Sequence, residues 1–167
     1  MENNKFFGKY RGKVIENDDA FNLGRIRAYA SLGGKQQIET GWALPSFPYA
    51  GEKVGFYFIP PVGASVWIEF EKGSLEDPIW TGCFWNENEQ IEEENLGPEI
   101  KMIQTNFARI KINDSNGSPE IKIKTESNLE ITLTSDEIKL TTNSQPSAKI
   151  SLKNNTVEVN EGALEVQ

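Results

Sequence analysis

The chain has 167 residues, a formal net charge of −8 and a pI near 4.7. This acidity argues against general binding to nucleic acids or anionic membranes, because both require clustered positive charge. The chain has no histidine, the commonest general base and metal ligand, and its single cysteine, Cys83, excludes an intrachain disulfide.

The N-terminal stretch MENNKFFGKYRGK has no apolar run of signal-peptide length. No other segment approaches the roughly 18 consecutive apolar residues of a membrane span. We therefore expect synthesis in the cytoplasm without a signal peptide.

The first 85 residues predict short β-strands separated by turns. Apolar and polar residues alternate in YRGKVIE, GRIRAYA, KVGFYFI, ASVWIEFEKG and PIWTGCFW. In the fourth run, Val66, Ile68 and Phe70 face one way, and Trp67 and Glu69 face the other. Five such strands without a helical period predict a small closed barrel, filled by the aromatic residues that are concentrated here.

The Pro60-Pro61 pair predicts a corner in this first part, since proline has no N–H to donate within a sheet, and Gly63 permits a sharp turn there.

The composition changes after Trp85. All aromatic residues except Phe107 lie at or before this residue. The acidic stretch NENEQIEEENLGPE comes next, and we assign residues 86–108 to a solvated linker and transition.

Residues 109–167 have a simpler pattern of apolar and polar residues than the first part. Seven short runs alternate strictly, namely RIKIN, EIKIK, LEITL, EIKLT, KISLK, TVEVN and ALEVQ, with turn-forming stretches such as NDSNGSP and KNN between them. Their apolar members are all aliphatic and form the predicted core of this part: Ile110, Ile112, Ile121, Ile123, Leu129, Ile131, Leu133, Ile138, Leu140, Ile150, Leu152, Val157, Val159, Leu164 and Val166.

Seven strands with one aliphatic face need a cover, because an exposed apolar stripe and free sheet edges lead to aggregation. One solution is a small sandwich within the chain. The other is a trimeric prism in which three copies bury their aliphatic side chains along a common axis. The lack of aromatic residues favours the prism.

Two long segments, GKYRGKVIENDDAFNLGRIRAY and GWALPSFPYAGEKVGFYFIPPVGASVWIEFEKGSLEDPIWTGCFW, resemble the N-terminal OB-fold domain of contractile-tail baseplate spikes. That family includes central phage spikes and the VgrG proteins of type VI secretion. The resemblance covers Phe7 to Trp85. The pattern of the second half is similar to that of the three-stranded β-helix, or needle, that follows this domain in such spikes. The resemblance implies an all-β chain with an OB-fold barrel at 1–85 and an intertwined trimeric β-helix at 109–167.

The resemblance implies a non-catalytic, membrane-piercing spike at the tip of a contractile tail or injection apparatus. We expect it in the baseplate of a phage, tailocin or related particle, with only transient membrane contact. The expected partners are two further copies of the chain, a separate hub protein and a PAAR-type tip protein. The lysozyme-like and hub domains of some relatives are not expected here, nor is their histidine-ligated iron site.

The resemblance also indicates candidate residues for contacts with partner proteins. Arg25 and Arg27 share a strand face, and Trp67 and Trp85 are expected to point outward, so we assign these four to contacts with the hub or a neighbouring barrel. The final residues Leu164, Val166 and Gln167 are the candidates for docking a tip protein.

The sequence gives less support to two other classes of function, an enzyme and a ligand-binding module. Glu69 and Glu71 are neighbours on one strand, which does not give the facing carboxyl pair of a glycosidase, and we expect no catalytic residue or cofactor. The stretch NDSNGSPE lacks the spacing of a calcium loop, so no metal site is expected. The alternative function is an OB-type nucleic-acid or carbohydrate binding module, which the overall acidity disfavours.

Overall fold

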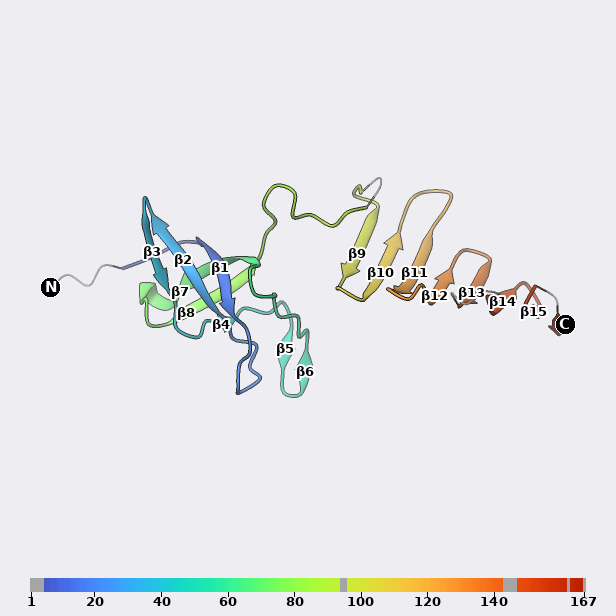
Figure 1. Ribbon diagram of the computed structural model, residues 1–167, viewed down its shortest axis with the longest axis horizontal. Coiled ribbons are helices and arrows are strands. Elements are labelled where there is room, and N and C mark those ends of the chain that lie inside the picture. Colours follow the sequence, from blue (N-terminus) through green and yellow to red (C-terminus); the bar gives the residue numbers. More distant parts are fainter. Residues whose placement is uncertain (1–4, 94–95, 143–146, 162, 167) are drawn as a thin grey trace. The chain divides into compact units, whose positions relative to one another are not determined.

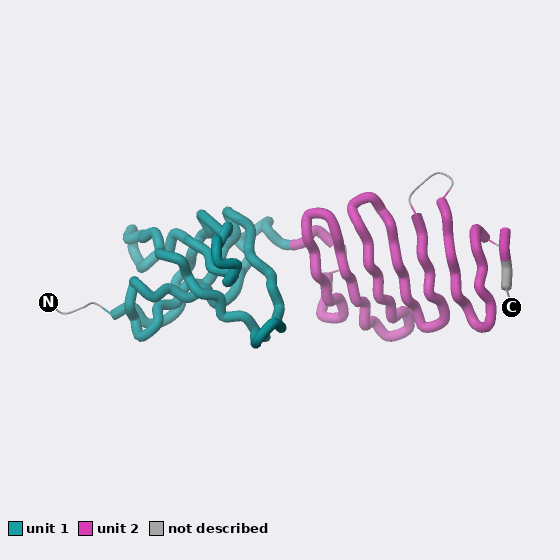
Figure 2. The backbone as a smooth tube through the Cα atoms, turned by 90° about the horizontal axis from the view of Figure 1, so that it is seen from below, with its two compact units in different colours: residues 1–90 teal, residues 91–167 magenta. Residues whose placement is uncertain are grey.

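The computed structural model describes residues 5–93, 96–142, 147–161 and 163–166. The fold is all-β, as predicted, and divides into two compact units, residues 1–90 and 91–167 (Figure 2). Besides a short 3₁₀ turn at Glu71–Gly73, the first unit contains the strands β1 (Tyr10–Glu16), β2 (Arg27–Gly33), β3 (Gln36–Glu39), β4 (Leu44–Pro45), β5 (Ala50–Gly51), β6 (Val54–Gly55), β7 (Ser65–Phe70) and β8 (Pro78–Cys83).

Six of these strands form one sheet in the order β3-β2-β1-β7-β8-β4 (Figure 1). The predicted closed barrel is wrong, because the strand ladders leave this sheet open. Among the described residues, a single isolated bridge between Ile26 and Ala43 links the two sides, just before β2 and β4. β4 is only two residues long, and within the described residues its one ladder is the parallel pairing with β8.

The core of the first unit follows the predicted alternation in β7. Val66, Ile68 and Phe70 are buried, while Trp67 and Glu69 lie on the other face. Most of the interior is filled by small and branched side chains rather than by rings, which corrects the expectation of an aromatic filling. Besides the three core residues of β7, the buried core consists of Val14, Ile26, Ala28, Ala30, Ala43 and Trp80.

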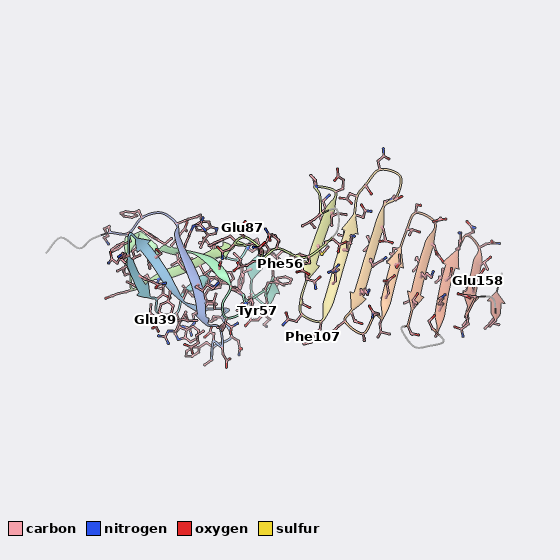
Figure 3. The ribbon with its side chains drawn as sticks, turned by 45° about the horizontal axis from the view of Figure 1, so that its top comes forward. Glu39, Phe56, Tyr57, Glu87, Phe107 and Glu158 are labelled. Atoms are coloured by element: carbon pink, nitrogen blue, oxygen red, sulfur yellow. The ribbon has the colours of Figure 1, made fainter. Side chains whose placement is uncertain are left out.

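The segment KVGFYFI forms a strand only at Val54–Gly55, where β6 pairs with β5 in a separate hairpin. Phe56 and Tyr57, labelled in Figure 3, follow it together with Phe58, and all three are exposed. The proline corner is confirmed, because residues 56–64 lie outside the strands. The Ala64 N–H donates to the Pro61 carbonyl at 3.0 Å, which closes a tight turn there.

The second unit is one antiparallel sheet of eight strands, each paired with the next along the chain (Figure 2). All seven predicted strands are present. An additional strand, β9, lies within residues 86–108, which the sequence analysis assigned to a linker and transition. The strands are β9 (Ile100–Gln104), β10 (Ala108–Asn113), β11 (Glu120–Thr125), β12 (Glu130–Leu133), β13 (Glu137–Thr141), β14 (Lys149–Lys153), β15 (Thr156–Val159) and β16 (Leu164–Val166).

Within one chain, the second unit is therefore a meander rather than a β-helix. Asn128, between β11 and β12, and Asn154, between β14 and β15, adopt positive φ angles in tight turns, which asparagine tolerates better than most residues. Side chains stand on both faces of this single layer (Figure 3). Any intertwining must come from the association of several chains.

Candidate functional site, an aliphatic sheet face

Two rows of aliphatic side chains run across the strands of the second unit. Directly opposed residues share a face, so the strand register carries each row from one strand to the next. The first row is Ile103, Ile110, Ile123, Ile131, Leu140, Ile150, Val159 and Leu164. The second row, from β10 onward, holds the register positions of Ile112, Ile121, Leu133, Ile138, Leu152, Val157 and Val166.

These two rows, together with Leu129 just before β12, are called the aliphatic face. It is uncovered in the single chain: Ile131 retains 37% of its accessible surface and Leu164 retains 59%, whereas Ile68 in the first unit retains none. Within the described residues of the second unit, no helix or strand lies over it. A hollow of about 410 Å³, lined by Ile123, Leu140 and other members of the rows, opens at its middle. Such a continuous apolar surface marks an interaction site.

The opposite face carries the charges. The register places Arg109 opposite Lys124 and Lys111 opposite Lys122, which is unfavourable for like charges. The Glu93 carboxylate offsets this, because it accepts from Arg109 Nη1 at 2.5 Å and from Lys111 Nζ at 2.6 Å. This polar face can remain in water, so the aliphatic face is the one that requires a partner.

Glu93 was not distinguished in the sequence from the neighbouring glutamates of the acidic stretch. Its side chain is only 15% exposed. The hydrogen bond from Lys111, supported by the charge of Arg109, holds the pKa of Glu93 below its usual value. No local signal could have identified it, since its partners lie on a strand 16 to 18 residues further along the chain.

Arg25, a candidate contact residue, is engaged within its own chain. The buried Asp19 carboxylate accepts from Arg25 Nη2 at 2.6 Å and from Arg25 Nε at 3.1 Å. It also accepts from the backbone N–H groups of Phe21 and Leu23. The hydrogen bond from Arg25 holds the pKa of Asp19 well below its usual value. The pair therefore fixes the loop that leads into β2.

Arg27 is engaged in the same way. Its guanidinium donates to Glu16 at 2.9 Å and also pairs with Glu39, so it joins β1, β2 and β3. Both arginines thus have carboxylate partners in their own chain. Their assignment to hub or neighbouring-barrel contacts stays a prediction.

The two candidate tryptophans differ in environment. Trp67 is half-buried and stacks on Phe84, with 4.6 Å between the ring centroids. The Arg11 guanidinium lies 5.2 Å from the Trp67 ring centroid and 4.8 Å from that of Phe84, a contact that the sequence did not reveal. Trp85 is 58% exposed. Protein contacts by Trp67 and Trp85 stay predictions.

At the C-terminal end, Leu164 is highly exposed. The side chain of Val166 and the whole of Gln167 lie outside the described residues. The assignment of these three residues to tip-protein docking also stays a prediction.

The carboxylates considered for catalysis form surface ion pairs. Glu69 lies 2.8 Å from Lys9, and Glu71 lies 3.5 Å from Lys72. Across the described ranges, no cluster of three or more His, Cys, Asp or Glu side chains could hold a metal ion. A search of the same residues finds no helix of sufficient length and apolarity to span a membrane.

Comparison with known proteins yields two family matches, one in each unit. Residues 10–85 match the type VI secretion system/phage-baseplate injector OB domain. Residues 100–165 match the phage baseplate V C-terminal trimerisation domain. The second match begins at the first residue of β9, which joins that strand to the trimerisation domain. A search of curated proteins finds no match.

Proposed function

The chain belongs to the baseplate spike family of phages and related injection systems, and we propose that it is a non-catalytic trimeric spike whose second units bury their aliphatic faces against one another. The observation that carries this proposal is the pair of continuous aliphatic rows from β10 to β16. Of the fifteen aliphatic residues that the sequence predicts as a core, twelve are exposed in the single chain.

A threefold arrangement suits this face. Each strand from β10 to β16 contributes two aliphatic register positions, and neighbouring strands lie ~4.8 Å apart, so these strands would form successive aliphatic layers of the trimer. Branched aliphatic side chains fill such a narrow axial core. Eight stacked strands give a stem about 35 Å long at this spacing. Along one chain, the sheet has free edges only at β9 and β16, the two ends of the stem.

The proposed task is mechanical. A stem in which successive strands are hydrogen-bonded along its length transmits an axial push without fraying, as membrane piercing at the tip of a contractile tail requires. We propose that the first unit contacts a separate hub protein, with Trp67 and the exposed Trp85 as candidate contacts. The β16 end, with its exposed Leu164, is the proposed docking site for a PAAR-type tip protein.

The test is the native mass of the full chain and of two neighbouring variants. We expect three times 18.8 kDa for the unmodified chain. Leu140→Asp places a charge in the first aliphatic row, between Ile131 and Ile150, and should abolish the trimer. Lys139→Asp is the control, because it lies on the polar face between Thr132 and Ser151 and should leave the trimer intact.

A monomeric unmodified chain would overturn the proposal. So would a trimer that survives Leu140→Asp but not Lys139→Asp, since the polar face would then be the buried one. Migration of the unheated trimer in detergent gels, with dissociation on boiling, would add evidence of the kinetic stability expected for such a stem.

The alternative predicted from the sequence, a nucleic-acid or carbohydrate binding module, has less support. A basic binding groove needs free cations. Arg25 and Arg27 are instead neutralised by Asp19, Glu16 and Glu39 of the same chain.

A further inference from the structure

One register position of the second aliphatic row is not aliphatic. In β9, the residue opposite Ile112 is Lys101, while Ile103 continues the first row opposite Ile110. Every later strand places Ile, Leu or Val at both positions. Because directly opposed residues share a face, Lys101 belongs to the aliphatic face and not to the polar one.

Lys101 has a partner on the same face. Its Nζ lies 2.5 Å from Oδ2 of Asp114. Asp114 follows Ile112 by two residues, and its N–H donates to the Glu99 carbonyl, so the backbone pairing of β9 and β10 extends to this residue. The first layer of the aliphatic face therefore holds an ion pair beside Ile103.

We propose that Lys101 and Asp114 of three chains form a ring of alternating charges that closes the first layer of the trimer core and sets its register. This inference rests on the proposed trimer, because only association of the aliphatic faces brings the three pairs together. Threefold symmetry repeats the order lysine, aspartate around the axis, so each junction between chains also joins opposite charges.

The physical need for such a layer follows from the uniformity of the rows. Aliphatic residues repeat at every strand, so a chain displaced along the axis by two strands would still bury apolar groups against apolar groups. A displaced chain would, however, bury its Lys101 against the aliphatic side chains of its neighbours, which is strongly unfavourable. A single polar position in an apolar core specifies register in coiled coils by the same principle.

The layer also ends the core. β9 is an edge strand, and an inward-pointing charge on an edge strand discourages the addition of further strands. Because β9 is the outermost strand of its sheet, aliphatic layers of the core lie on only one side of the ring. This position limits the desolvation penalty that six deeply buried charges would suffer.

A second ion pair in the same sheet serves as a control, because it has similar exposure but involves a lysine on the polar face. Lys153 lies 3.7 Å from Asp136, and their side chains are 54% and 61% exposed in the single chain, close to the 53% and 54% of Lys101 and Asp114. By alternation with Leu152, Lys153 is on the polar face. In the proposed trimer, only the Lys101–Asp114 pair should interact with the charges of neighbouring chains.

The experiment mixes two kinds of full-length chain. One is unmodified, and the other carries the exchanged pair K101D/D114K and a mass tag. The exchanged chain keeps its internal ion pair and should form homotrimers, since its ring also alternates. In any mixed trimer, two of the three junctions bring like charges together. After joint refolding at low salt, native mass spectrometry should show mixed trimers about fivefold or more below the statistical 1:3:3:1 ratio.

The matched control is the exchange D136K/K153D, which should mix with the unmodified chain in the statistical ratio. Raising the salt to about 1 M, where the Debye length is about 3 Å, should bring the first mixture toward that ratio. A statistical mixture for K101D/D114K at low salt would overturn the ring while leaving the trimer intact. A monomeric unmodified chain would instead overturn the proposed function.

If the exchanged chain does not form trimers alone, single variants decide the matter. Asp114→Lys gives an all-positive ring and should weaken the trimer at least about tenfold more than Asp136→Lys at low salt, measured as the concentration of half-dissociation. Equal weakening by the two variants would overturn the proposal.

Discussion

At the scale of single residues, carboxylates hold distant segments of this chain together. Asp19 fixes the loop before β2 through Arg25, and Glu93 joins the chain ahead of β9 to two cations on β10. Neither carboxylate differs in its local sequence from neighbours that are exposed. Their roles come from partners that the fold brings within hydrogen-bonding distance.

The Glu93 pairing predicts a dependence of stability on pH. A carboxylate whose pKa is lowered on folding stabilises the protein fully above its usual pKa, 4.5 for Glu93, and loses this effect as the pH falls through its lower native pKa. Glu93→Gln should reduce stability by about 1–2 kcal/mol at pH 7, because Arg109 and Lys111 lose a charged partner. Below pH 4.5 the difference between the two proteins should shrink.

Thermal unfolding followed by far-UV circular dichroism at several pH values between 7 and 3 measures this effect. Glu92→Gln is the control, since Glu92 is exposed and has no ion pair within the described residues. A deficit of Glu93→Gln that stays constant down to pH 3 would contradict the assigned role of the carboxylate.

At the scale of elements, the two units solve the problem of covering a sheet differently. β7 buries Val66, Ile68 and Phe70 inside its own unit, and Gly12 on β1 permits close packing there. A Cβ atom at Gly12 would lie 2.9 Å from Cγ1 of Ile68. The strands β10–β16 have the same alternation but no second layer within their unit, so their hydrogen bonds need other chains for protection from water.

Hydrogen exchange should show this difference strand by strand. In the trimer, the amides of β11–β14 should exchange more slowly than those of the edge strands β9 and β16. In the Leu140→Asp variant, protection should fall in all eight strands while β1 and β7 remain protected. Protection of β11–β14 that is unchanged in a monomeric variant would mean that the single sheet is stable alone.

At the scale of the whole molecule, the distribution of aromatic residues allows the unfolding of the first unit to be followed separately by fluorescence. All four tryptophans and all four tyrosines lie in the first unit. Phe107, labelled in Figure 3, is the single aromatic residue of the second. Tryptophan fluorescence therefore reports the first unit, whereas far-UV circular dichroism reports strands of both.

Unfolding of the two units should depend differently on protein concentration. Association stabilises the unit that it buries, so the transition of the second unit should move to higher temperature as the concentration rises. The fluorescence transition of the first unit, which has its own core, should stay in place. Melting curves over a hundredfold concentration range measure both, and identical shifts of the two signals would contradict separate stabilisation.

Much of the second unit could be predicted from the sequence. Seven of its eight strands follow from an alternation of period two, which is local and needs no knowledge of strand pairing. The core of β7 followed from the same rule. The strand β9 was missed because IKMIQ does not alternate strictly and directly follows an acidic stretch. The closed barrel was wrong because the length of β4 and its single ladder with β8 are not marked in the sequence.

What the sequence determined by itself is the all-β class, the seven strands from β10 to β16 and the single aliphatic face, because side-chain alternation is set by the geometry of each strand alone. Only the tertiary structure decided which residues oppose one another. The like-charged pairs of β10 and β11 and the position of Lys101 in an aliphatic row depend on strand register, and the ion pairs of Glu93 depend on how the chain ahead of β9 folds back onto β10. Register is a relation between strands, so no single stretch of the sequence contains it.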